Sequence, residues 1–176
     1  MNLIKRIACL AVATGAMVAG VAVAHDTWVQ ANTNIVRVGD AVHIDLLLGN
    51  HGNEHRDFKL AGKADLESST LDVIAPDGTK HDLKTGAVDL GFAPKEGYIT
   101  TRFQPDQAGM YLVTQTSDKV VSYAPKRSIK SAKAFFVASP SLDKVSMNHP
   151  GFDRVLGHAL ELVPETNPVT PMGPGT

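Results

Sequence analysis

A histidine directly behind a signal-peptidase motif is the feature of this sequence with the clearest chemistry. Ala22 and Ala24 supply the small residues that the peptidase requires, and His25 follows at once. Cleavage after Ala24 would give a mature chain whose first residue carries both a free α-amine and an imidazole. These two nitrogens can close one chelate ring around a metal ion, which displaces the proton of an amine with a pKa of about 7.7 to 8.0 at little cost.

Further donors gather between residues 50 and 57. His51, Glu54 and His55 lie close together there, but the neighbouring asparagines and glycine indicate a loop, so the histidines share no helical face. We expect this loop either to ligate a metal or to be solvated. His43 alternates with Asp45 on the wet face of a predicted strand, where a carboxylate can orient an imidazole. The candidate metal ligands are therefore His25, His51, His55, Glu54 and His43.

A terminal amine and two imidazoles form a three-nitrogen site that suits copper(II) or nickel(II) and, less tightly, cobalt(II). The affinity order favours copper at almost any nitrogen site, so the sequence does not choose among these metals. The alternative is a frayed terminus with no ligand role. The remaining histidines are expected to be surface or structural residues: His81, His149 and His158.

The segment before His25 predicts export. Lys5 and Arg6 precede an apolar run over residues 7–19, which is shorter than the roughly 20 residues of a membrane span. We therefore expect a signal peptide over 1–24, a periplasmic or secreted location, and no stable membrane insertion after cleavage. An uncleaved N-terminal anchor is the main alternative.

Composition excludes several classes of function. Removing residues 1–24 also removes Cys9, the only cysteine, and leaves a mildly acidic chain. Such a chain attracts neither nucleic acid nor anionic lipid, and it has no disulfide or thiolate metal site. The sequence holds no Gly-x-Ser-x-Gly, phosphate-binding glycine loop or His-Glu-x-x-His pattern, so we do not expect an enzyme.

Alternation with a period of two dominates the chain and predicts an all-β domain. We expect a strand, a tight turn and a strand over 35–48, and a hairpin over 71–84 around Pro76-Asp77-Gly78. Further strands are predicted at 98–103, 110–116, 120–123, 133–137 and 157–163. So many short strands favour two packed antiparallel sheets, an immunoglobulin-like β-sandwich.

Three further features refine this expectation. Residues 107–113 resemble the start of a late strand in immunoglobulin-like domains, where Tyr111 would tie back a corner; an ordinary half-buried tyrosine is the alternative. Trp28 is expected to be buried and to pin the first strand. The prolines and glycines of 164–176 indicate a linker, so the sandwich domain is assigned to 25–163.

One basic concentration is expected to form a solvated face or to bind an anion or acidic protein: Lys119, Lys126, Arg127, Lys130 and Lys133.

Several of these elements together resemble the DUF4198 family. They are Ala24-His25-x-x-Trp28, Val38-Gly39-Asp40, residues 48–57 and residues 122–133. The resemblance implies exported proteins described as periplasmic components of nickel or cobalt uptake. It also implies an immunoglobulin-like domain followed by a second β domain, which is missing after the linker of this chain. From the family we carry over His25 as a ligand, with His51 and His55 ranked below it.

These observations lead to one main hypothesis and two alternatives. The main hypothesis is a non-enzymatic periplasmic module that binds nickel, cobalt or copper and hands the ion to a membrane transporter component. The first alternative is a structural or protein-interaction sandwich without a small ligand. The second is a copper-dependent oxidative enzyme that acts on polysaccharide through the same terminal histidine.

Overall fold

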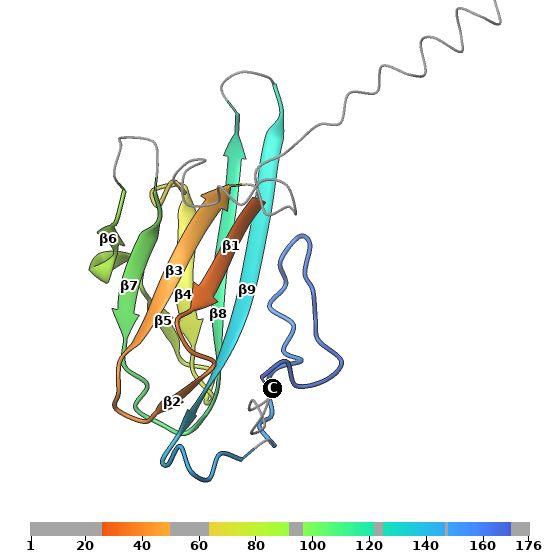
Figure 1. Ribbon diagram of the computed structural model, residues 1–176. Helices are drawn as coiled ribbons and strands as arrows, with labels where there is room; N and C mark the ends of the chain where they lie inside the picture. The colour runs from red at the N-terminus through yellow and green to blue at the C-terminus, as the bar shows by residue number, and fades with distance from the viewer. Residues whose placement is uncertain (1–25, 50–63, 92–96, 122–124, 147, 170–176) are drawn as a thin grey trace, which may run out of the picture.

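The alternating residues form two β-sheets packed face to face (Figure 1). The structure, a computed structural model, describes residues 26–49, 64–91, 97–121, 125–146 and 148–169. The four-stranded sheet has the order β1 (Asp26–Ala31), β3 (Val42–Gly49), β7 (Ile99–Phe103), β6 (Val88–Asp89). The five-stranded sheet has the order β2 (Ile35–Arg37), β9 (Arg127–Ser139), β8 (Gly109–Val120), β4 (Ser69–Ile74), β5 (Lys80–Asp82). A 3-10 turn, η2 (Lys84–Gly86), precedes β6. The predicted all-β sandwich is confirmed.

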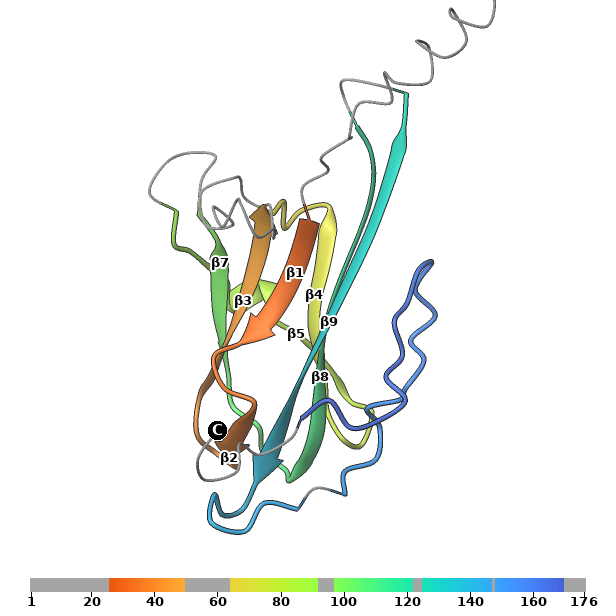
Figure 2. The same cartoon turned by 45° about the vertical axis from the view of Figure 1, so that its right-hand side comes forward.

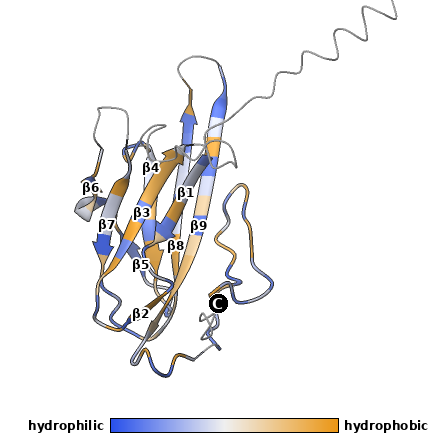
Figure 3. Ribbon diagram, in the orientation of Figure 1, coloured by the Kyte–Doolittle hydropathy of each residue, from blue (hydrophilic) through white to orange (hydrophobic). Residues whose placement is uncertain are grey.

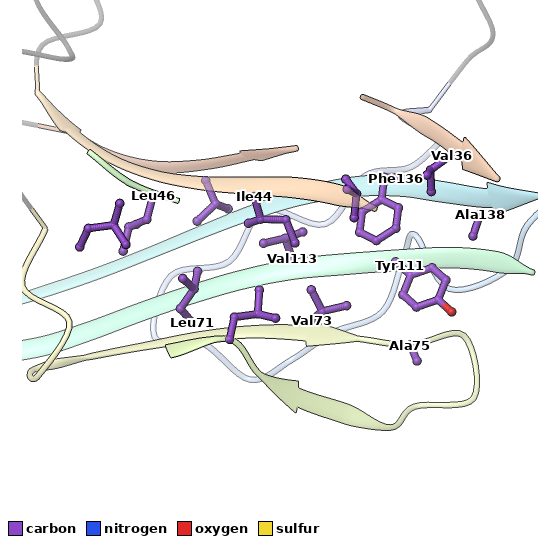
Figure 4. Packing of buried hydrophobic residues seen from close by; sticks show 14 residues of the cluster. Val36, Ile44, Leu46, Leu71, Val73, Ala75, Tyr111, Val113, Phe136 and Ala138 are labelled. Carbon is purple, nitrogen blue, oxygen red and sulfur yellow. The ribbon is translucent and has the colours of Figure 1, made fainter. Parts of the chain in front are cut away.

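The core lies between the sheets because every second side chain of each strand points inward. Ile44 and Leu46 of β3 face Leu71 of β4 and Val113 of β8, and all four are fully buried (Figure 4). Figure 3 shows the same division along the chain: β3 is largely hydrophobic, whereas the projecting end of the β8–β9 hairpin is hydrophilic. Burial of these aliphatic side chains drives the two sheets together.

Tyr111 of β8 forms the predicted tyrosine corner. Its hydroxyl donates to the carbonyl of Gln107 at 3.0 Å and accepts from the N–H of Gln107 at 3.2 Å. Burial raises the pKa of Tyr111, so the hydroxyl stays protonated as a donor. The chain then enters β8 through Gly109 at φ 142, where a Cβ would lie 2.6 Å from Cγ of Pro76. This position therefore requires glycine.

Replacing Tyr111 with phenylalanine is expected to lower the free energy of unfolding by about 1 to 2 kcal/mol. The ring packing is kept, but both backbone groups of Gln107 lose their partner. Urea denaturation followed by fluorescence measures the change in the free energy of unfolding. An unchanged m value would show that the substitution does not alter the surface exposed when the protein unfolds. A loss below about 0.3 kcal/mol would contradict a stabilising corner.

The connection between β2 and β3 differs from the expectation. The tight turn forms, with Gly39 at φ 88 and the N–H of Asp40 bonded to the carbonyl of Arg37 at 3.0 Å. However, β2 pairs in parallel with β9, and β3 pairs with β1 and β7. The predicted strand, turn and strand are therefore present, but alternation fixed only the face of each strand and not its partner. The second predicted hairpin is confirmed as β4–β5, with Gly78 at φ 92.

The β8–β9 hairpin is longer than predicted. The register runs without interruption from Gly109↔Ala138 to Val120↔Arg127, so the expected strands at 110–116 and 133–137 are parts of one ladder. The hairpin projects beyond the other strands (Figure 2). Its projecting part carries serine, lysine and aspartate on both faces. The alternation of apolar and polar residues that predicts a strand is therefore absent there.

Residues 140–146 and 148–169 lie along the outer face of the five-stranded sheet without forming a strand (Figure 2). The strand predicted at 157–163 is therefore wrong: Leu160 and Leu162 are 78% and 85% exposed and have no sheet to join. The segment covers a second apolar cluster made of Ile74, Met110, Leu112, Val137 and Val169. The packed part of the segment thus continues to Val169. The domain boundary at residue 163 stays a prediction.

Candidate functional site

The end of the sandwich where β1 begins and β3 ends is the part of the fold closest in sequence to the candidate ligands. The register pairs Asp26 with Gly49. His25 directly precedes Asp26 in the sequence, and Asn50 directly follows Gly49. The ligands predicted here lie outside the described residues: His25, His51, Glu54 and His55.

His43 is the one candidate ligand that the structure places. It is exposed on β3 opposite Arg102, and Asp45 follows on the same face, as predicted. Asp45 accepts a hydrogen bond from Nε2 of Gln30 at 3.3 Å. His43 and Gly49 are six positions apart, which is about 20 Å along a strand. His43 therefore lies at the opposite end of the sheet from Asp26.

A small cavity of about 40 Å³ lies at the Asp26 end. Gln115 lines it and is 1% exposed; its Nε2 donates to Oγ of Ser69 at 3.3 Å. Its Oε1 has no hydrogen-bond partner among the described residues. A buried acceptor beside a cavity of this size suits a single bound water. The remaining polar side chains of the lining are those of Thr27, Asp65, Ser117, Lys119 and Lys130.

One carboxylate and two ammonium groups line this cavity, from Asp65, Lys119 and Lys130. The hydrogen bond from Ser68 is the largest influence on Asp65 and lowers its pKa, helped by the N–H of Glu67 and the charge of Lys119. Burial lowers the pKa of Lys130, whose Nζ lies 3.4 Å from Oγ1 of Thr27. This set supplies oxygen atoms and ammonium groups. A transition metal here would need its imidazole ligands from outside the described residues.

A larger pocket of about 410 Å³ lies between β1, β9 and residues 158–164. Trp28 lines it and is half-buried, while its neighbour Val29 points into the core at 6% exposure. Trp28 is therefore less buried than expected, because successive residues of a strand face opposite sides and Val29 takes the inward position. Trp28 instead lies on the outer face beside Leu47, its fully buried cross-strand neighbour.

A buried ion pair connects this pocket to the C-terminal segment. Nζ of Lys133 lies 2.6 Å from Oε1 of Glu161, and each side chain is only 8% exposed. The carboxylate also accepts the N–H groups of Leu156 and Gly157 at 2.8 and 2.9 Å. Burial alone would raise the pKa of Glu161, but the bonds from Lys133 and from these backbone groups outweigh it and lower the pKa to about 2. Sequence reasoning missed this pair because its members lie far apart in the chain and carry no motif.

The predicted basic concentration is not one solvated face. Arg127 pairs with Asp118 across the hairpin, Lys133 is buried with Glu161, and Lys130 is half-buried. Only part of the positive charge is therefore available to a ligand.

Two of the other histidines, His158 and His81, have contacts within the fold. His158 lies 3.3 Å from Oγ1 of Thr114, which agrees with the structural role expected for it. His81 packs its ring against Phe103 at a centroid distance of 5.3 Å and is half-buried.

The described part of the chain has neither a metal-binding cluster nor a membrane-spanning helix. No three His, Cys, Asp or Glu side chains gather there closely enough to hold a metal ion. No helix within the same ranges has the length and apolar character needed to cross a membrane.

Comparison with known proteins gives a family and a similar solved structure. A family model described as a domain of unknown function (DUF4198) matches residues 22–172. No curated protein matches the chain. A crystal structure of a DUF4785 family protein from Legionella pneumophila is similar at 13% identity with a TM-score of 0.42; the match covers 62% of this chain and 27% of that one.

Proposed function

The chain belongs to the DUF4198 family, and from this premise we propose that it is an exported metal-binding module with the mature N-terminal His25 as a ligand. The proposed cargo is nickel(II), cobalt(II) or copper(II), bound without chemical transformation and passed to a membrane transporter component. The pairing of Asp26 with Gly49 is the observation that carries this proposal.

The pairing limits the distance between the proposed ligands. Cα atoms of paired residues in an antiparallel ladder lie about 4.5 to 5.5 Å apart, and consecutive Cα atoms about 3.8 Å apart. The Cα atoms of His25 and Asn50 therefore lie within about 13 Å of each other in any conformation, and His51 is one residue further. A site that combines His25 with a histidine of residues 50–57 is within reach of the chain.

The chemistry of a terminal histidine supports the same proposal. Its amine and imidazole form a chelate only when no residue precedes it, and a further imidazole completes a set of nitrogen ligands suited to these metals. Asp26 and Asp65 offset the charge of Lys119 and Lys130 at this end of the sandwich, which limits repulsion of a cation.

Adding one glycine ahead of His25 is expected to weaken nickel(II) and copper(II) binding at least tenfold, because the amine no longer shares a chelate ring with the imidazole. Calorimetric titration of the processed protein measures this, after intact mass has confirmed the cut following Ala24. The matched control carries the extra glycine at the C-terminus and should bind as the unmodified protein does. Equal affinity with either extension would overturn the terminal-amine site.

A further inference from the structure

The pocket of about 410 Å³ beside β9 has the size and lining of a small-molecule site. Apolar side chains line it from three parts of the chain: Trp28 from β1, Phe135 from β9, and Leu160 and Leu162 from the C-terminal segment. Figure 2 shows that segment as a blue loop that rises beside β9. Ligand pockets have volumes of about 300 to 1,000 Å³ and mainly apolar linings. One turn of an α-helix, about 10 Å wide, would already fill this volume, so a small molecule fits better than a folded element of a partner.

The loop that carries Leu160 and Leu162 is fixed to the sheet. The hydroxyl of Ser131 donates to the carbonyl of Leu160 at 2.6 Å, and Nζ of Lys133 lies 2.6 Å from Oε1 of Glu161. These bonds hold the backbone of the loop in place, while the side chains of Leu160 and Leu162 stay 78% and 85% exposed. The pocket is therefore formed before a ligand arrives, which lowers the entropy cost of binding.

The charges of the lining are already neutralised within the protein. Lys133 and Glu161 are its basic and acidic side chains, and they form the ion pair in which each is only 8% exposed. Nε2 of His158, which also lines the pocket, lies 3.3 Å from Oγ1 of Thr114. A charged ligand would lose its hydration here without gaining an unpaired opposite charge, which opposes its binding. An uncharged apolar ligand has no such cost.

We propose that this pocket binds a small, uncharged aromatic molecule. Aromatic rings pack favourably against the rings of Trp28 and Phe135, and the ligand would cover the two exposed leucines of the opposite wall. Exposed apolar side chains that border a hollow are typical of ligand-binding grooves. The proposal does not use the proposed metal ligands, so either site can exist without the other.

Two fluorescent dyes with the same pair of aromatic groups test the charge preference. N-phenylnaphthylamine is uncharged, whereas anilinonaphthalene sulfonate carries one negative charge on the same skeleton. Titration of the processed protein is expected to show saturable binding of the uncharged dye, at least tenfold tighter than that of the sulfonate. Equal affinity for the two dyes, or tighter binding of the sulfonate, would overturn the proposal.

Trp28 shows whether the dye occupies this pocket. It is the only tryptophan, so its indole N–H gives a single NMR signal in the processed protein. That signal should shift as N-phenylnaphthylamine is added and should saturate with the affinity measured by fluorescence. Dye binding that leaves the Trp28 signal in place would exclude the pocket as the site.

Leu162→Ser tests the opposite wall without disturbing the core, because this side chain is 85% exposed. It is expected to weaken binding of the uncharged dye at least fivefold while the urea midpoint stays unchanged. Leu142→Ser is the matched control: Leu142 is 57% exposed in the same C-terminal part of the chain but does not line the pocket. Equal dye binding by the two variants would contradict the proposed site.

Two further measurements address other occupants. Sedimentation equilibrium without dye should show a monomer, and a dimer whose formation shifts the Trp28 signal would replace the small molecule by a second copy. Vesicles of uncharged phosphatidylcholine should leave the protein in the supernatant. Sedimentation with the vesicles that Leu162→Ser abolishes would instead assign the exposed leucines to a lipid surface.

Discussion

Replacing Phe136 with alanine is expected to lower the free energy of unfolding by about 3 to 5 kcal/mol. The ring is fully buried on β9 and stacks on Tyr111 of β8 at a centroid distance of 4.9 Å and an angle of 6°. It also meets Phe103 of the opposite sheet edge-on at 6.3 Å. Its removal would therefore leave a cavity at the point where aromatic side chains join the two sheets. Urea denaturation measures the loss.

Phe152→Ala is the matched control for this substitution. Phe152 undergoes the same chemical change, but it is only half-buried against the second apolar cluster on the outer face of the sheet. Its loss should cost less than half as much, because solvent already reaches the ring. Equal destabilisation by the two substitutions would contradict the assignment of the main core to the space between the sheets.

Replacing Glu161 with glutamine is expected to destabilise the C-terminal segment by about 3 kcal/mol. The substitution leaves the ammonium group of Lys133 buried without its carboxylate and weakens the acceptor for the N–H groups of Leu156 and Gly157. The effect should be local: hydrogen exchange should rise over residues 148–169, and the cluster around Met110 and Leu112 should bind a hydrophobic dye. Glu165→Gln, an exposed change in the same segment, is the control.

The same pair gives the protein a defined dependence on pH. The pKa of Glu161 falls from an ordinary value of 4.5 to about 2 on folding, so the unfolded state binds more protons between these values. This contribution to stability is complete above pH 4.5 and is lost as the pH falls towards 2. Because a single irregular segment separates the pair from solvent, we discount the contribution to about 1 to 2 kcal/mol.

Comparison of unfolding curves between pH 5 and pH 2 tests this dependence. The unmodified protein and Glu165→Gln should lose the same increment as the pH falls. Glu161→Gln should lack that increment because it has no carboxylate to protonate. An identical slope in all three proteins would show that Glu161 is not stabilised by ionisation in the folded state.

The projecting hairpin shows where sequence reasoning reaches its limit. Hydrophobic alternation located the inner parts of β8 and β9, since one face of each is buried there. The outer parts carry polar residues on both faces, and only the pairing of Val120 with Arg127 shows that they are strands. The length of the β8–β9 pairing was not predicted, because the pattern of a single strand does not reveal how far its pairing extends.

The sequence by itself determined the features that depend on neighbouring residues. Alternation placed the inward-facing side chains, Pro76-Asp77-Gly78 made a hairpin turn, and Tyr111 reached back four residues to Gln107. The chemistry of a terminal His25 also follows from the sequence, as a prediction. Only the tertiary structure decided which strands pair, that Asp26 lies opposite Gly49, and that Lys133 meets Glu161. These contacts join distant parts of the chain, and local preferences do not encode their register.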